Sequence, residues 1–529
     1  MEENSDLAHI FSSNVVPKPI EATIVRANID SLTSKIFHLE KELQRQRAAI
    51  SAVRKLTLEI LGQIFKLVLP DCLDRAARFQ LIDLCLVSKS WCDAARQTPS
   101  LWRGIRVEYA DVSYDKILAW YGRSGSTLRT LEVIPPDIDD ECMELDDCQS
   151  PNDELRQLLT FGPTINHLSI KCSSGQCFTN FTFGWIWGDN VSLPEPRPWD
   201  SIKSFNFTLT GRWEESAVNP DEPGDSGFMW IPPAVVSLQI NLPDSSVAFP
   251  FDNGMAPPDM RIHLAEAWTL DTLTSFSISC NWGGPHILEI VKHCKNVETL
   301  TIDFKNSELP DSRAAVMKQL SRVGLSLVKL RTLRLRQVSP STAGKLFRVL
   351  KAPVLAQLDI SFGEVKIWQG KKFDDELGRL VQQSSTAFRS LNLRLHNVSF
   401  PPDDLSNTLS ALPSISHLTL DEVGLVNHGR KDIFSVLREA VKYLPHIEVI
   451  EILNASTKSA SPSSIPSLLG LWKKPFNGQP ALNRLRSFAA TFKDTKEAGS
   501  QSYNVDETEI VQELRRSGLL VNVGPVGAT

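Results

Sequence analysis

Residues 330–360 read LRTLRLRQVSPSTAGKLFRVLKAPVLAQLDI and contain one complete unit of the pattern that decides the fold. The order apolar-x-x-apolar-x-apolar occurs near each end, as LRTLRL from Leu330 and LAQLDI from Leu355. Between the two, TAGKLFRVLKA has the apolar spacing of a helix. A strand, a helix and a second strand in the same sense give two parallel strands. The stretch therefore predicts an α/β unit with a parallel sheet.

The six-residue pattern recurs from residue 128 to residue 490, with central apolar residues 24 to 38 positions apart. The matches are LRTLEV, INHLSI, IKSFNF, VVSLQI, LTSFSI, VETLTI, LRTLRL, LAQLDI, FRSLNL, ISHLTL, IEVIEI and the imperfect LRSFAA. Helical segments separate several of them, namely SRAAVMKQLSRVG, TAGKLFRVLKA, FDDELGRLVQQ and KDIFSVLREAVKYL. The series resembles the leucine-rich repeat, which implies an α/β solenoid.

The repeats depart from the regular pattern at the turn after each strand. A regular repeat usually carries Asn or Cys three residues after the last strand leucine. The corresponding positions here hold Ser173, Lys305, Val338, His396 and Val423. The expected fold class is therefore an irregular leucine-rich-repeat-like arc with long loops over residues 106–493, and a polar tail over 494–529.

One position in each strand pattern points away from the apolar side, and eleven of these twelve residues are polar. Ordinary solvation explains this polarity, and solenoids also bind partners on such a concave face. The candidate substrate-binding residues are Asn206, Gln239, Arg334, Asp359, Asn392 and Glu451. A local basic cluster of Arg331, Arg334, Arg336 and Arg389 is a candidate for reading an acidic or phosphorylated partner.

A heptad pattern fills residues 24–53, after a flexible N-terminus at 1–23. Apolar residues alternate at spacings of three and four, with Gln46 in the single gap: Ile29, Leu32, Ile36, Leu39, Leu43, Ile50 and Val53. Two interpretations stay open. The stripe packs on its own chain, or it forms a homodimeric coiled coil.

Residues 54–105 read as a compact helical domain. Thr57 is expected to cap the helix LEILGQIFKLVL, and Pro70 to stop it. A second helix is expected around RFQLIDLCLVSKSWCDAAR, and a third short element at TPSLW, with Trp102 as its apolar anchor.

This helical domain, KLTLEILGQIFKLVLP followed by LCLVSKSWCDAARQTPSLWRGI, resembles the F-box domain. The family pattern is Leu-Pro-x-Glu-Ile/Leu-Leu-x-x-Ile-Phe, then Val-Ser/Cys-x-x-Trp, then Pro-x-Leu-Trp. Thr57 stands where the family has proline. Together with the preceding helix, the chain is similar to F-box proteins of mushroom-forming fungi. The residues that the resemblance assigns to binding the Skp adaptor are Leu56, Thr57, Ile60, Leu61, Ile64, Phe65, Val87 and Trp91.

The resemblance implies a substrate-recognition subunit of an SCF-type cullin–RING ubiquitin ligase. The F-box would dock on Skp, and the repeats would hold a protein substrate without performing chemistry themselves. The alternative is a non-ligase interaction scaffold that uses the F-box and the heptad helix. An enzyme is not expected, because GxGxxG, P-loop, HExxH and GxSxG motifs are absent from the sequence.

Composition and sequence motifs limit the partners and the cellular compartment that can be expected. The 529 residues are 42% hydrophobic with a net charge of -6, which predicts a sizeable core and argues against nucleic-acid binding. Without a membrane-length apolar run, a secretory signal or a CxxC pair, the chain is expected in the cytoplasm or nucleus, with reduced thiols and no metal or cofactor. The acidic stretch 137–148 is expected to be a solvated loop rather than a cation site.

Overall fold

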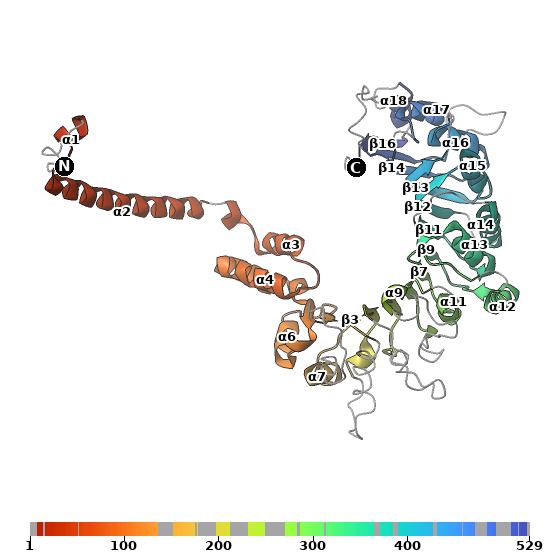
Figure 1. The fold of residues 1–529 in the computed structure, drawn as a ribbon, viewed down its shortest axis with the longest axis horizontal. Helices are drawn as coiled ribbons and strands as arrows, with labels where there is room; N and C mark the ends of the chain where they lie inside the picture. Colours follow the sequence, from red (N-terminus) through yellow and green to blue (C-terminus); the bar gives the residue numbers. More distant parts are fainter. Residues whose placement is uncertain are drawn as a thin grey trace, which may run out of the picture. The chain divides into compact units, whose positions relative to one another are not determined.

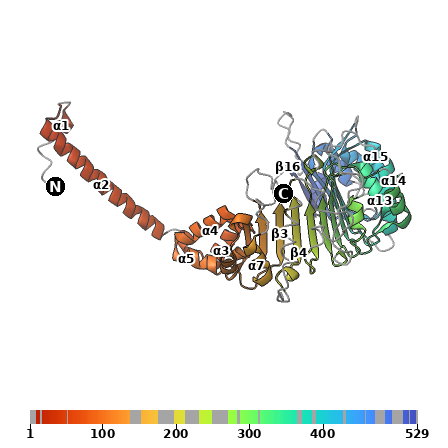
Figure 2. The same ribbon diagram turned by 60° about the horizontal axis from the view of Figure 1, so that its bottom comes forward.

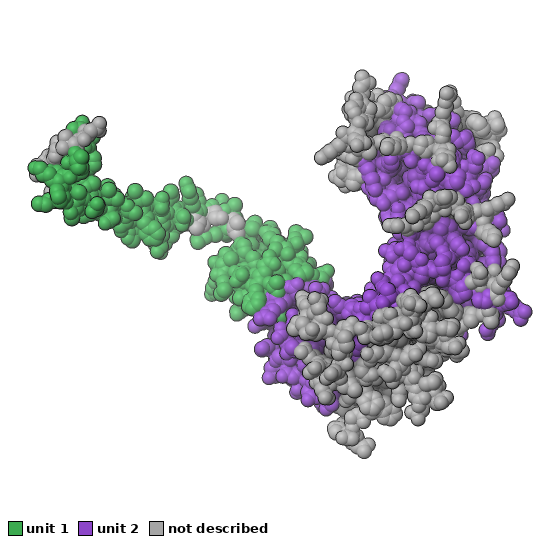
Figure 3. Space-filling view, viewed as in Figure 1, with its two compact units in different colours: residues 1–71, 76–101 green, residues 72–75, 102–529 purple. Residues whose placement is uncertain are grey.

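A computed structural model describes residues 8–13, 16–50, 52–135, 152–174, 177, 197–211, 231–248, 270–282, 286–310, 314–363, 371–384, 390–426, 431–456, 459–470, 484–493, 509–516 and 518–525. The acidic stretch 137–148 and Arg389 lie outside these residues. The chain divides into two compact units, which Figure 3 colours separately. Unit 1 comprises residues 1–71 and 76–101, and unit 2 comprises residues 72–75 and 102–529.

Unit 1 is helical over its described residues. Its elements are α1 (Ala8–Ser12), α2 (Pro19–Ala49), η1 (Ala52–Lys55), α3 (Leu58–Val68), α4 (Arg75–Val87, of which Arg75 belongs to unit 2), α5 (Lys89–Arg96) and most of η2 (Pro99–Trp102). α2 is a single long helix (Figure 1), and α3 ends immediately before Leu69 and Pro70. The predicted heptad helix and the helix that Pro70 stops are therefore both present.

Unit 2 contains a parallel sheet whose strands are neighbours in the order in which they occur along the chain. The described residues of this sheet form 14 strands. They are β1 (Gly104–Glu108), β2 (Thr130–Ile134), β3 (His167–Cys172), β4 (Ser204–Leu209), β5 (Ser237–Asn241), β6 (Ser275–Ser279), β7 (Thr299–Asp303), β9 (Thr332–Val338), β11 (Gln357–Phe362), β12 (Leu391–Phe400), β13 (Ile415–Leu425), β14 (Val449–Ala455), β15 (Ser487–Phe492) and β16 (Leu520–Pro525). The predicted parallel sheet is confirmed.

Each of the twelve sequence matches forms one of these strands. Except in FRSLNL, their central apolar residues stand opposite one another across the sheet, as in the series Leu131, Leu168, Phe205, Leu238 and Phe276. All five side chains are buried. Because side chains alternate along a strand, this row forms the apolar side of the sheet and its neighbours point the other way.

Helices connect most successive strands. The α-helices among the described residues of unit 2 are α6 (Tyr114–Tyr121), α7 (Asp153–Phe161), α9 (Ser245–Ala248), α11 (His286–Val291), α12 (Ala315–Val323), α13 (Pro340–Val349), α14 (Lys371–Ser384), α15 (Pro402–Ser410), α16 (Ile433–Ala440), α17 (Ile465–Leu469) and α18 (Glu509–Arg516). All four predicted helices are among them. The sheet of unit 2 bends, with strands along the inner side and helices along the outer side (Figures 1 and 2). A two-stranded parallel pair, β8 (Leu325–Ser326) and β10 (Leu350–Lys351), flanks α13.

The sheet extends beyond the predicted repeats at both ends. β1 precedes the first match, and a bridge from Leu73 to Ile105 continues the pairing outside it. At the other end, β16 pairs with β15, and α18 packs on it through the buried Val511. The prediction of a polar tail after residue 494 is therefore wrong for residues 509–516 and 518–525, because their apolar side chains complete the core.

Trp102 was expected to anchor the helical domain, but it belongs to unit 2. Its ring lies 4.7 Å from that of Trp120 on α6, and the Arg123 guanidinium lies 4.7 Å from the Trp102 ring centre. Trp102 also begins an apolar-x-x-apolar-x-apolar run, WRGIRV, that becomes β1. Unit 1 therefore ends at Leu101, four residues before the expected domain boundary at residue 105.

Left-handed backbone recurs where strands turn towards the following helix. Residues with positive φ include Gln337 in β9, Asn397 in β12, Glu422 in β13 and Asn454 in β14. Asparagine tolerates this conformation better than most residues, and the Asn397 side chain also donates to the Phe362 carbonyl at 3.2 Å. Asparagines thus serve some of these turns, although not at the position where a regular repeat carries them.

Candidate functional site

Helix α3 has two apolar faces. Leu61 and Phe65 point into unit 1 and are 2% and 1% exposed, whereas Ile64 is 38% and Leu67 is 87% exposed. Ile60, also exposed, lies four residues before Ile64, which puts Ile60, Ile64 and Leu67 on one face. A helix normally buries its apolar stripe. The second stripe of α3 is therefore available to another molecule.

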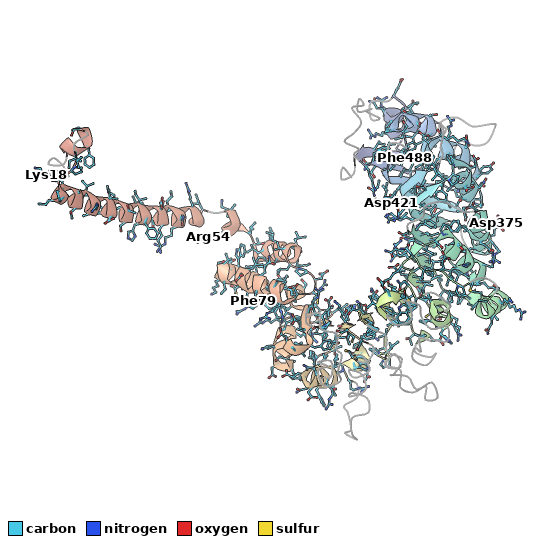
Figure 4. The ribbon with its side chains drawn as sticks, in the orientation of Figure 1. Lys18, Arg54, Phe79, Asp375, Asp421 and Phe488 are labelled. Carbon is cyan, nitrogen blue, oxygen red and sulfur yellow. The ribbon has the colours of Figure 1, made fainter. Side chains whose placement is uncertain are left out.

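Helix α4 repeats this arrangement. Ala77 and Leu81 are buried, whereas Phe79, Ile82 and Leu86 are exposed at helical spacing. Figure 4 labels Phe79 on this helix. The exposed apolar residues of both helices, here called the α3–α4 apolar surface, are Ile60, Ile64, Leu67, Val68, Phe79, Ile82, Leu86 and Val87. Exposed large apolar residues in this number are typical of interaction sites.

The eight residues predicted to bind the adaptor separate into two groups. Ile60, Ile64 and Val87 are exposed, and they belong to the α3–α4 apolar surface. The other apolar members pack inside unit 1, wholly or in part: Leu56, Leu61, Phe65 and Trp91. The sequence motif contains both groups without distinguishing the residues that build the domain from those that face outwards.

The packing group holds α3 against α5. The Phe65 and Trp91 rings lie 5.3 Å apart at 53°, a favourable tilted aromatic contact. Ser88 caps α5 by accepting a hydrogen bond from the Trp91 amide at 3.3 Å. A Cβ added at Gly62 would collide with the Thr98 Oγ1, so a larger residue here would require Thr98 to move. The motif residues therefore fix a tight helix contact beneath the exposed face.

Thr57 stands at the N-cap of α3, as predicted, but its hydroxyl makes no capping bond. Its carbonyl accepts from the Leu61 amide at 3.1 Å and so begins the helix. A side-chain hydrogen bond with Thr57 instead lowers the pKa of Glu59. The expectation of a side-chain cap was wrong, because the hydroxyl is used by Glu59. The helix nevertheless begins without proline.

A second candidate site is the polar side of the sheet in unit 2, along the inner side of the bend. Of the six residues predicted there, Asp359 is buried, Arg334 and Gln239 are exposed, and Asn206 and Glu451 are half-buried. Figure 4 labels Asp421 on this inner side and Asp375 of α14 on the outer side.

Several charged residues on strands β9 to β14 are paired across neighbouring strands. Arg336 donates to both oxygens of Asp359, at 2.8 and 2.6 Å. This pairing raises the pKa of Arg336. In the same way, Arg394 donates to Asp421 at 2.6 Å, and Asn454 adds a bond to Asp421 at 2.8 Å. Two buried carboxylates are thus satisfied by residues of neighbouring strands.

Glu451 belongs to a further pair on β13 and β14. His417 Nε2 lies 3.1 Å from Glu451 Oε2, and the Thr419 hydroxyl donates to the same oxygen at 2.8 Å. These contacts, chiefly the one with His417, lower the pKa of Glu451. Lys493 lies 2.6 Å from Glu422 on β13. The carboxylates Glu422 and Glu451 are therefore both held by residues of neighbouring segments.

The predicted basic cluster is mostly neutralised in its described part. Arg331 lies 4.0 Å from Glu298, and Arg336 is bound to Asp359. Arg334 is exposed and makes no ion pair with any described residue. Of the described arginines in this cluster, Arg334 is therefore the one best placed to meet a partner.

Two of the predicted residues, Asn206 and Gln239, are both hydrogen-bonded to Asn241 on β5. Asn241 donates to Asn206 at 3.3 Å and accepts from Gln239 at 3.4 Å. Asn241 also donates to Thr208 at 3.0 Å. Neutral amides and hydroxyls line this part of the face, in contrast to the charged pairs on β9 to β14.

Asn392 is not equivalent to the other predicted residues. Leu358 stands opposite Leu393, so Arg394, and not Asn392, occupies the register of Asp359 and Thr419. The sequence pattern therefore placed the central leucine of this strand two residues too early, at Leu391 instead of Leu393. Asn392 still faces outwards and accepts a hydrogen bond from Ser416 at 3.3 Å. The sequence LNLRL extends the alternation of FRSLNL, and only the register shows which leucine is central.

Several residues of both sites were missed by sequence reasoning. On unit 1 they are Leu67, Val68, Phe79, Ile82 and Leu86. On unit 2 they are Arg394, His417, Asp421 and Asn454. A second apolar stripe at helical spacing would have identified the first group. The second group follows only from the strand register.

Among the described residues, no three His, Cys, Asp or Glu side chains gather where they could hold a metal ion. Within the described residues, no helix is long and apolar enough to cross a membrane. The described cysteines are free thiols. No protein-family model matches the chain, and no curated protein matches it either.

Proposed function

We propose that this chain is the substrate-recognition subunit of an SCF-type cullin–RING E3 ubiquitin ligase. In this proposal, residues 54–105 are an F-box that docks on the Skp adaptor. Unit 2 is an irregular leucine-rich-repeat-like solenoid that binds a protein substrate. The subunit performs no chemistry and needs no cofactor. It raises the effective concentration of substrate near the transferred ubiquitin, in the cytoplasm or the nucleus.

The observation that carries the proposal is the α3–α4 apolar surface. Ile60, Ile64 and Val87 occupy motif positions of the F-box and are exposed, although they are large apolar residues. Folding of unit 1 does not explain their exposure, because Leu61 and Phe65 already form its core. An apolar partner that covers both helices would explain it.

The polar side of the unit 2 sheet supports the second half of the proposal. A row of interstrand pairs holds its charged side chains in fixed positions, so a partner meets a preorganised pattern. Arg334 and the pairs of Asp421 and Glu451 offer both donors and acceptors. A folded or extended protein substrate with complementary polar groups would suit this face.

Co-purification with Skp and a cullin tests the proposal. The variant Ile60→Lys/Ile64→Lys puts two charges on the α3–α4 apolar surface and leaves the buried contacts of α3 in place. Val323→Lys on α12 is the matched control, because Val323 is also an exposed apolar helix residue, 69% exposed. We expect the wild type and the control to retain both partners and the double variant to lose both. Retention of neither by the wild type would refute the proposal.

A non-ligase scaffold is the second candidate function. The exposed heptad stripe of α2 favours it, because an interaction helix needs no ligase to act. The same co-purification separates the two functions. A chain that retains Skp without a cullin would support the scaffold and contradict the ligase subunit.

A further inference from the structure

The heptad residues of α2 do not pack on the described part of the chain. Ile29, Leu32, Ile36, Leu39 and Leu43, here called the α2 stripe, are all about half exposed or more, with Leu39 at 70%. The interpretation in which this stripe packs on its own chain is therefore wrong for the described residues. A stripe of large aliphatic side chains along one helix face requires a partner helix.

The residue types of the stripe favour a parallel pair. Ile29 and Ile36 fall at heptad position a, as does Leu43, and Leu32 and Leu39 fall at position d, so that two of the three stripe residues at a are β-branched. β-Branched residues at a with leucine at d favour two parallel strands. Gln46 falls at d in the next heptad. In a parallel, in-register pair each Gln46 meets its own copy, so that the two amides can bond to one another.

The charged residues beside the stripe also favour a parallel pair. In a parallel pair, position g of one helix faces the following e position, five residues on, of the other. Lys35 then faces Glu40, and Glu42 faces Arg47. Both pairs join opposite charges, and each occurs twice by symmetry. All four side chains are exposed, although Glu42 also lies 3.7 Å from Arg45 of its own helix.

Antiparallel pairing fits less well. In an antiparallel pair, g faces g and e faces e. The register that sets Ile36 against Leu32 brings two copies of Lys35 together, besides two attractive pairs of Arg26 with Glu40. The register that sets Ile36 against Leu39 brings Arg26 against Arg47, twice, besides two attractive pairs of Lys35 with Glu42. The parallel pair joins only opposite charges at these positions. Each of these two registers also places Gln46 against an apolar residue, Ala22 or Ile29, whose side chain cannot form a hydrogen bond with the Gln46 amide.

We propose that α2 forms a parallel, in-register, two-stranded coiled coil with a second copy of this chain. The dimer brings together two copies of unit 1 and unit 2. The proposal of a dimer is independent of the proposed ligase function, because it rests only on the α2 stripe and the charged residues beside it. A dimeric receptor would engage a substrate with two binding faces, and so gain avidity for substrates that are themselves repeated or oligomeric.

Sedimentation equilibrium of the full chain, from about 1 to 100 µM, tests the proposal. We expect a dimer for the wild type. Lys35→Glu and Glu40→Lys each turn the two symmetric attractions into repulsions, and each should weaken dimerisation about tenfold. The matched control is Lys41→Glu, the same substitution at the outward position f, and it should leave the dimer unchanged.

Mixing the two weakened variants tests whether the helices pair in parallel and in register. In a parallel, in-register heterodimer, the glutamate that Lys35→Glu introduces on one chain faces the lysine that Glu40→Lys introduces on the other. The unchanged Lys35 of the second chain faces the unchanged Glu40 of the first, so both attractions return. We expect the mixture to form heterodimers more tightly than either variant forms homodimers. The double variant Lys35→Glu/Glu40→Lys should also regain the wild-type affinity.

Three results would overturn the proposal. The first is a wild-type chain that stays monomeric over the whole concentration range. The second is a dimer that is insensitive to Lys35→Glu and Glu40→Lys. The third is a dimer that these substitutions weaken but that neither mixing nor the double variant restores. The second and third results would point to antiparallel pairing or to a different interface.

Discussion

The ion pair between Arg336 and Asp359 predicts an asymmetric response to truncation. Both Asp359 oxygens accept from Arg336, and the Asp359 side chain is only 7% exposed, whereas that of Arg336 is 35% exposed. Arg336→Ala leaves a buried carboxylate without its two charge-assisted bonds. Asp359→Ala leaves a guanidinium that can still reach water and that also interacts with Asp303.

The expected costs follow from these environments. Loss of two charged hydrogen bonds at a buried group costs about 3 kcal/mol of local stability. Loss of the acid costs about 1 kcal/mol, because the remaining cation becomes hydrated. Arg334→Ala is the control on the same strand. Arg334 is exposed and makes no ion pair among the described residues, so its truncation should change stability by less than about 0.5 kcal/mol.

Hydrogen exchange measured on peptides from β9, β11 and β12 is the suitable assay. A chain with two units need not unfold in one step, so a single melting temperature would not isolate this sheet. Arg336→Ala should speed exchange in these strands most, Asp359→Ala less, and Arg334→Ala hardly at all. Equal effects of Arg334→Ala and Arg336→Ala would refute the reasoning, as would a larger effect of Asp359→Ala.

Two further predictions concern stability. Burial raises the pKa of Asp374 in α14 to about 7 from the ordinary 3.8, so the folded chain binds an extra proton between these values and its stability should fall as pH rises from about 4 to 7. Asp374→Asn should remove this fall in hydrogen exchange of α14 peptides, and an unchanged pH dependence in this variant would contradict the assignment. Phe65→Ala should destabilise unit 1 by about 3 to 5 kcal/mol, enough to unfold a domain of this size, and proteolysis between residues 58 and 96 would report it. Ile64→Ala on the opposite face of α3 is its control, and equal protease sensitivity of the two variants would count against the division of α3 into buried and exposed faces.

Much of unit 2 could be predicted from the sequence, because its strands share one physical requirement. Each strand needs inward apolar residues at fixed spacing, and this repetition identified twelve of the fourteen strands in the main sheet. The two end strands were missed for different reasons. WRGIRV fits the pattern, but the family motif places Trp102 in the helical domain. The last strand has Gly518 where the other matches have an apolar residue.

The polar faces could be predicted less well. Alternation has a period of two, so a strand such as LNLRL fits in two registers, and the pattern placed the central leucine at Leu391 instead of Leu393. The sequence likewise gives no means of telling that Arg336 is paired and Arg334 is not, since both point outwards from one strand. On unit 1, the motif identified Ile60 and Ile64, while the exposure of Phe79 and Leu86 depends on which face of α4 packs inwards.

Direct binding of purified Skp to the full chain tests the central claim most simply. Titration calorimetry would compare the wild type, Ile60→Lys/Ile64→Lys and the control Val323→Lys, with circular dichroism to verify that all three are folded. The proposed function predicts saturable binding by the wild type and the control, and a loss of at least about a hundredfold in affinity for the double variant. A folded wild type that does not bind Skp, or a double variant that binds as tightly as the control, would contradict it.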